Sequence, residues 1–76
     1  MKYFVDGKVK KGFNTPQAGI NYIKNARKYG GYVYEYDNNN GKIRMIILVC
    51  ANGDIIDTTT NPEFKIESQW TETKNL

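Results

Sequence analysis

The sequence predicts a two-layer α+β domain in which one helix packs on one face of a mainly antiparallel sheet of five or six strands, in the order β-β-α-β-β-β. Three observations support this fold class: apolar residues alternate over several short runs, one stretch has helical spacing, and turn-forming sequences link most of the runs. Strands joined by hairpins pair antiparallel, and such a sheet buries a face against a helix. The 76 residues are expected to form one domain over residues 1–70, with a flexible tail at residues 71–76.

The first two strands are predicted at the N-terminus. Residues 2–5 are rich in strand formers, Asp6-Gly7 follows, and alternation resumes over residues 8–10. Because glycine tolerates the positive φ of a type I′ turn, Asp-Gly between two such runs predicts a two-residue hairpin. That turn would place Tyr3 directly opposite Lys10.

A helix is predicted between Thr15 and Gly30-Gly31. Thr15 can cap the first turn, and Pro16 stands where its missing N–H costs nothing. Since a left-handed glycine ends many helices, Gly30 is expected to be that residue. The apolar stripe at helical spacing consists of Ala18, Tyr22, Ile23, Ala26 and Tyr29, with Ile20 beside it.

Two central strands are predicted at residues 31–37 and 42–51, joined by a turn at residues 38–41. A four-residue loop there pairs Asp37 with Lys42, Tyr36 with Ile43, Glu35 with Arg44, Tyr34 with Met45 and Tyr32 with Ile47. We favour this register because it sets two opposite-charge pairs across the strands. A two-residue loop at Asn40-Gly41 would shift the partners by two and keep every side chain on its face.

The remaining chain is predicted to return in two segments. Asn52-Gly53 is a two-residue hairpin signal that leads into residues 54–58. Further on, alternation with polar residues fits a last edge strand or an extended segment lying on the body of the domain. The alternating residues are Phe64, Ile66, Ser68 and Trp70.

Alternation divides the side chains of these strands between two sheet faces. The more apolar face is expected to receive the helix, and it carries Tyr32, Tyr34, Tyr36, Ile43, Met45, Ile47, Val49 and Ile56. The opposite face is aliphatic with a charged rim, and it carries Val33, Ile46, Leu48, Cys50 and Ile55. One helix cannot cover both faces.

An uncovered aliphatic patch on a small protein usually marks a contact surface. The predicted partner-binding residues are Val33, Ile46, Leu48 and Ile55, with Lys42 and Arg44 on the rim. Three occupants stay open at this point. They are the chain's own C-terminal segment (through Phe64, Ile66 and Trp70), a second copy in a homodimer, and a different protein.

Composition argues against several function classes. The chain has no histidine and a single cysteine, Cys50, so the commonest general base, the usual zinc ligand and an intrachain disulfide are all excluded. The acidic residues form no patterned buried pair and no phosphate-binding loop precedes the helix, so we predict a protein that is not an enzyme and has no cofactor or metal. The longest apolar run, residues 45–51, is far shorter than the roughly 20 residues of a membrane span. A small domain without disulfides is expected in the cytoplasm, with no membrane partner.

These observations favour a module that binds another protein. In size, in its Asn-, Lys- and Tyr-rich composition and in its hairpin–helix–hairpin layout, the chain resembles the small accessory proteins of phages and mobile elements, anti-CRISPR proteins among them. The resemblance implies an inhibitor that blocks a host protein or a defence complex. It assigns no functional residue.

Nucleic-acid binding is the alternative function. Residues 1–30 hold seven basic residues and one acid, whereas residues 31–76 hold four basic residues and seven acids. Such asymmetry can steer an anionic partner to the first half of the chain. The residues that would form this surface are Tyr3, Lys8, Lys10, Lys11, Lys24, Arg27 and Lys28. If the two sheet faces are exchanged, Tyr32, Tyr34 and Tyr36 become an exposed stacking row of the kind that single-strand binders use.

Overall fold

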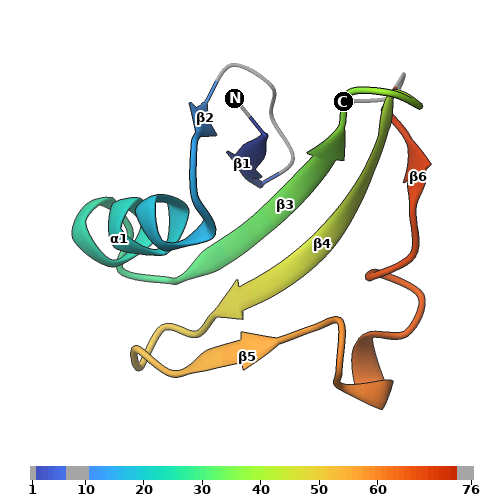
Figure 1. Cartoon of the computed structure of the whole chain (residues 1–76). Coiled ribbons are helices and arrows are strands. Elements are labelled where there is room, and N and C mark those ends of the chain that lie inside the picture. Colours follow the sequence, from blue (N-terminus) through green and yellow to red (C-terminus); the bar gives the residue numbers. More distant parts are fainter. Residues whose placement is uncertain (1, 7–10, 74–76) are drawn as a thin grey trace.

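The computed structural model of the chain describes residues 2–6 and 11–73 and confirms the predicted fold class. Its elements, in chain order, are β1 (Tyr3–Val5), β2 (Gly12–Phe13), α1 (Pro16–Ala26), β3 (Gly31–Asp37), β4 (Lys42–Val49), β5 (Ile55–Asp57), a 3-10 helix η1 (Pro62–Phe64) and β6 (Thr71–Glu72). The strands form one antiparallel sheet in the order β2-β1-β3-β4-β5, and β6 also pairs with β4. The helix lies against one face of this sheet (Figure 1).

The pairing of β1 with β2 differs from the predicted tight hairpin. Tyr3 lies opposite Phe13, and Phe4 lies opposite Gly12, so the predicted pairing of Tyr3 with Lys10 is wrong. Asp6 does turn the chain with a positive φ of 59°, but the turn does not set the register. Phe13 packs against the ring of Tyr22 on α1, with ring centroids 5.6 Å apart. Contact between these two half-buried rings favours the pairing of β1 with Gly12 and Phe13. The strand predicted at residues 8–10 lies outside the described residues.

The helix begins as predicted but ends earlier. The hydroxyl of Thr15 accepts the N–H of Ala18 at 3.2 Å and caps the first turn. The last helical residue is Ala26, and the extended backbone of the next residue leads the chain toward Gly30, which has a φ of +83°. Tyr29 therefore lies outside the helix, 74% exposed, and is not part of the apolar stripe.

The helix packs on the sheet face opposite to the predicted one. Its core partners are Val5, Val33 and Val49, which enclose Ile20 and Ile23. A Cβ on Gly19 would lie 3.3 Å from Cγ2 of Val33, so the helix approaches the sheet closely at that point. Small branched side chains permit this approach, whereas the row of tyrosines would hold a helix farther away. The number of apolar residues on each face therefore predicts the wrong face, because the size of the side chains decides how closely the helix can approach.

A β-bulge explains the rest of the face error. The predicted register from Asp37–Lys42 to Tyr34–Met45 is confirmed, but Tyr32 pairs with Leu48 and not with Ile47. The irregularity lies between Val33 and Tyr34, where the register shifts by one residue on β4. As a result, Ile47 and Val49 share the helix side, while Ile43 and Met45 share the other.

The turn from β4 to β5 has one residue more than predicted. Val49 lies opposite Ile55, and the N–H of Cys50 donates to the carbonyl of Asp54 at 2.8 Å. The connection therefore consists of residues 51–53, and Gly53 takes the left-handed position with a φ of +95°. A three-residue hairpin loop with glycine at this position is a common alternative to the two-residue turn.

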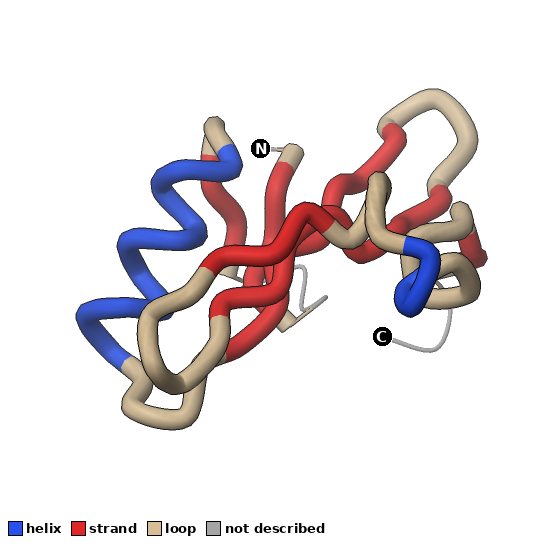
Figure 2. Tube along the Cα trace, turned by 90° about the horizontal axis from the view of Figure 1, so that it is seen from below, coloured by secondary structure: helices blue, strands red, loops and turns tan. Residues whose placement is uncertain are grey.

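The C-terminal segment is neither a long strand nor a tail from residue 71. Residues 62–64 form η1 and residues 65–68 are turns, so the predicted strand through Phe64 and Trp70 is wrong. Thr71 and Glu72 join the sheet as β6 opposite Ile43 and Lys42, and residues 74–76 of the predicted tail lie outside the described part. Figure 2 shows α1 and η1 far apart, with the strands between them.

Candidate contact surfaces

The structure does not bring the predicted partner-binding residues together on one surface. Val33 is fully buried beneath α1 and is not accessible to a partner, because it lies on the face that receives the helix. Ile46 is half-buried and packs against the same core. Leu48 points to the other face, opposite Tyr32. Ile55 is 46% exposed but pairs with Val49 on the helix side.

The predicted rim residue Arg44 is engaged within its own chain. Its Nε and Nη2 atoms donate to Oε1 of Glu35 at 3.1 and 3.0 Å, and the Trp70 ring lies 4.7 Å from the guanidinium carbon. Lys2 also pairs with Glu35 at 3.1 Å, and this hydrogen bond raises the pKa of Lys2 above its ordinary value. Lys42 lies farther along β4, opposite Asp37. Lys42 and Arg44 therefore lie near the start of β4, whereas Leu48 lies near its end.

Three apolar side chains stand side by side on the face away from α1. Tyr32 on β3 lies directly opposite Leu48 on β4, which lies directly opposite Ile56 on β5. We call these three residues the open row. Tyr32 is 40% exposed, and Leu48 and Ile56 are half-buried. Directly paired side chains in neighbouring strands make contact, so the row forms one continuous apolar strip.

The other half of the same face is closed. Phe4, Ile43 and Met45 are exposed by only 4%, 3% and 5%. The N–H of Met45 donates to the carbonyl of Glu67 at 3.1 Å, and the Thr58 hydroxyl donates to the carbonyl of Met45 at 3.1 Å. The chain after β5 therefore packs along β4 next to Met45 and does not cover the open row.

The tyrosine row of the alternative function is accordingly only partly accessible. Tyr36 is half-buried and meets Phe4 edge-on, with ring centroids 6.0 Å apart. Tyr34 is half-buried as well, and burial, with smaller contributions from Tyr32 and Glu67, raises the pKa of its hydroxyl above the ordinary value. Of the three tyrosines, Tyr32 alone counts as exposed.

A shallow depression of about 250 Å³ adjoins the open row. Its lining includes Tyr32 and Leu48 from the row, together with Arg27, Tyr29 and Cys50. Arg27 forms an ion pair with Asp6, and its guanidinium carbon lies 5.7 Å from the centre of the Tyr29 ring. The exposed Tyr29 ring and the ion pair between Arg27 and Asp6 thus lie beside the apolar strip.

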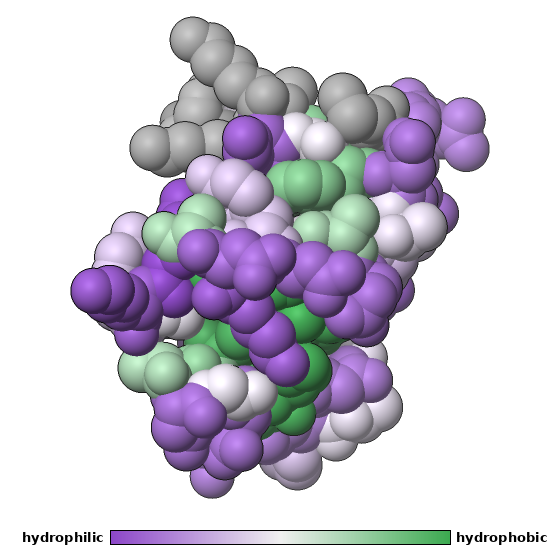
Figure 3. Space-filling view, turned by 90° about the vertical axis from the view of Figure 1, so that its left-hand side faces the viewer, coloured by the Kyte–Doolittle hydropathy of each residue, from purple (hydrophilic) through white to green (hydrophobic). Residues whose placement is uncertain are grey.

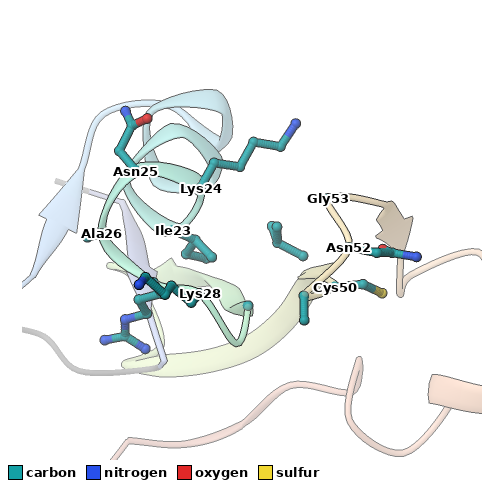
Figure 4. Close-up of a pocket in the computed structure, with 12 residues that line it drawn as sticks. Ile23, Lys24, Asn25, Ala26, Lys28, Cys50, Asn52 and Gly53 are labelled. Carbon is teal, nitrogen blue, oxygen red and sulfur yellow. The ribbon is translucent and has the colours of Figure 1, made fainter.

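A larger cleft of about 540 Å³ separates the end of α1 from the β4–β5 turn. Figure 4 shows the side chains around it, which come from residues 23–28 on one wall and from residues 50–53 on the other. On the side of the molecule where α1 lies, Figure 3 shows hydrophobic atoms in a hollow beneath polar side chains. Lys24 and Lys28 are exposed at the rim.

The basic residues of the alternative function are brought together only in part. Lys24, Arg27 and Lys28 gather at the end of α1, and the Lys11 ammonium lies 4.5 Å from the centre of the Tyr22 ring on the same helix. Tyr3 is half-buried against the helix core. The two other predicted residues, Lys8 and Lys10, lie outside the described residues.

Within residues 2–6 and 11–73, no group of three His, Cys, Asp or Glu side chains could hold a metal ion. No helix in the same residues has the length and apolarity needed to cross a membrane. Comparisons with protein-family models, with curated proteins and with solved structures find no match to this chain. The open row therefore has to be interpreted from its own chemistry.

The open row was not predicted from the sequence, because the bulge at Ile46 carries no recognisable signal. The exposure of Tyr29 could have been suspected from its position after Lys28.

Proposed function

We propose that the protein is a non-enzymatic module that binds another protein through the open row. The observation that carries this proposal is the continuous strip of Tyr32, Leu48 and Ile56 on a face whose other half is closed by the chain itself. An apolar strip with an exposed aromatic neighbour has the composition of the centre of a protein interface. Tyr29 beside it is a residue type that anchors such contacts.

The mode of action would be occlusion of a partner's surface. The resemblance in size and layout to small phage and mobile-element accessory proteins supports an inhibitor of a host or defence protein in the cytoplasm. Nucleic-acid binding receives less support, because Arg27 is paired with Asp6 and Tyr34 and Tyr36 are half-buried.

The test compares two single substitutions that add the same charge to different surfaces. Leu48→Asp places a carboxylate in the middle of the open row, whereas Ile66→Asp changes a side chain that is 77% exposed in the C-terminal segment. The tagged protein is used to capture partners from cells that produce it. We expect a stoichiometric partner with the unaltered chain and with Ile66→Asp, and at least about a tenfold loss with Leu48→Asp.

Far-UV circular dichroism of all three proteins provides the folding control. Because Leu48 is only half-buried, the helix signal should persist in Leu48→Asp. A folded Leu48→Asp protein that captures the partner as well as the unaltered chain would contradict the proposal. Absence of any stoichiometric partner would do so too. Light scattering across concentration identifies self-association, and a homodimer broken by Leu48→Asp would assign the row to a second copy.

A further inference from the structure

The cleft between α1 and the β4–β5 turn is a second surface, separate from the open row. Its volume of about 540 Å³ falls within the range of small-ligand and peptide pockets. Gly30 fixes its base, because a Cβ there would lie 2.2 Å from the carbonyl oxygen of Val49. The cleft is therefore set by the fold and not by loose side chains alone.

The charge of this cleft has one sign. Among the described residues that line it, three are basic (Lys24, Arg27 and Lys28) and none is acidic. Arg27 is paired with Asp6. In the part of the chain that the structure describes, Lys24 and Lys28 form no ion pair, and both are exposed. Two ammonium groups at the rim thus attract an anionic ligand.

The helix end adds hydrogen-bond acceptors beside these cations. The last carbonyls of a helix have no partner within the helix. Here the N–H of Arg27 donates to the carbonyl of Ile23 at 2.9 Å. Within the described residues, no backbone N–H donates to the carbonyls of Lys24, Asn25 and Ala26. They remain available to N–H donors of a ligand in the cleft.

These features together select a ligand with carboxylates and N–H donors. We propose that the cleft binds an acidic peptide segment. Its carboxylates contact Lys24 and Lys28, and its main-chain N–H groups donate to the carbonyls at the end of α1. A nucleic acid would also match the lysines, so it is the competing ligand in the test.

The probe is a fluorescein-labelled synthetic pentapeptide with the composition Asp-Glu-Leu-Glu-Asp, and binding is followed by fluorescence anisotropy at about 50 mM salt. We expect saturable binding to the full chain. The double variant Lys24→Glu/Lys28→Glu should weaken it at least about tenfold. Lys42→Glu/Lys65→Glu makes the same change in net charge elsewhere and should leave affinity within about twofold. Leu48→Asp should bind the peptide like the unaltered chain, which separates this site from the proposed function.

Amide chemical shifts locate the bound peptide. We expect shifts to be concentrated at residues 24–28 and 51–53. No saturable binding, equal loss in both double variants, or shifts confined to other residues would each overturn the proposal. A labelled ten-nucleotide thymidine strand is the competing probe. If it binds more tightly than the peptide and loses affinity with Lys24→Glu/Lys28→Glu, the cleft is a phosphate-binding site and the peptide proposal is wrong.

Discussion

Replacement of Gly30 by alanine tests how the junction between α1 and β3 is held. Gly30 has a φ of +83°, a conformation that costs an L-residue about 1–2 kcal/mol. A Cβ would also lie 2.2 Å from the carbonyl oxygen of Val49 and 3.1 Å from the backbone N of Ala51. These are backbone atoms, so no side-chain rotation relieves the overlap. We therefore expect Gly30→Ala to lower the free energy of unfolding by more than about 3 kcal/mol.

Gly53→Ala is the matched control, because Gly53 has a similar φ of +95° but nothing lies within 4 Å of a Cβ there. It should lose about 1 kcal/mol from backbone strain alone. Thermal unfolding followed by circular dichroism measures both variants. For a domain of this size, 1 kcal/mol corresponds to about 4–8 °C in Tm, so Gly30→Ala should lower Tm by more than about 12 °C. Equal losses at the two glycines would refute the packing argument.

Two further substitutions test contacts around β4 and β5. Thr58→Val removes the buried hydroxyl that donates to Met45 and should cost about 1–2 kcal/mol in urea denaturation, whereas Thr58→Ser should retain most of that stability. The side-chain hydrogen bond from Thr59, followed by backbone N–H groups, lowers the pKa of Asp57 below its ordinary value. Because the pKa of Asp57 is lower in the folded chain, its ionised carboxylate stabilises the fold at pH values above the unfolded pKa of about 3.9. This contribution is lost as the pH falls through the folded pKa. Asp57→Asn should therefore be less stable than the unaltered chain at about pH 7, and the difference should shrink as the pH falls through the folded pKa; a difference that does not change with acid would contradict this origin.

Several signals that act over a few residues were read correctly from the sequence, although the two-residue turn predicted at Asn52-Gly53 was not. The cap at Thr15 and the loop at residues 38–41 both depend on neighbouring backbone geometry. Gly30 has the predicted left-handed conformation, but it does not end the helix, whose last residue is Ala26. The fold class therefore followed from local patterns.

Features decided by packing between distant segments were not predicted. The register of β1 with β2 depends on Phe13 meeting Tyr22, and alternation alone does not reveal this contact. The bulge near Ile46 exchanges the faces of the second half of β4, so a period of two placed both Ile47 and Leu48 on the wrong face of the sheet. The predicted contact surface mixed residues from both faces for this reason, and Leu48 is the member of it that joins the open row.

The most direct test of the open row as a protein-contact surface is site-specific photo-crosslinking. A benzophenone amino acid replaces Tyr32 in one protein and the exposed Ile66 in a control, and both are irradiated in cells that produce the chain. We predict one discrete adduct with a different protein from position 32, absent from position 66 and lost when Leu48→Asp is added. An adduct with a second copy of the chain, equal adducts from both positions, or no adduct at position 32 would contradict it.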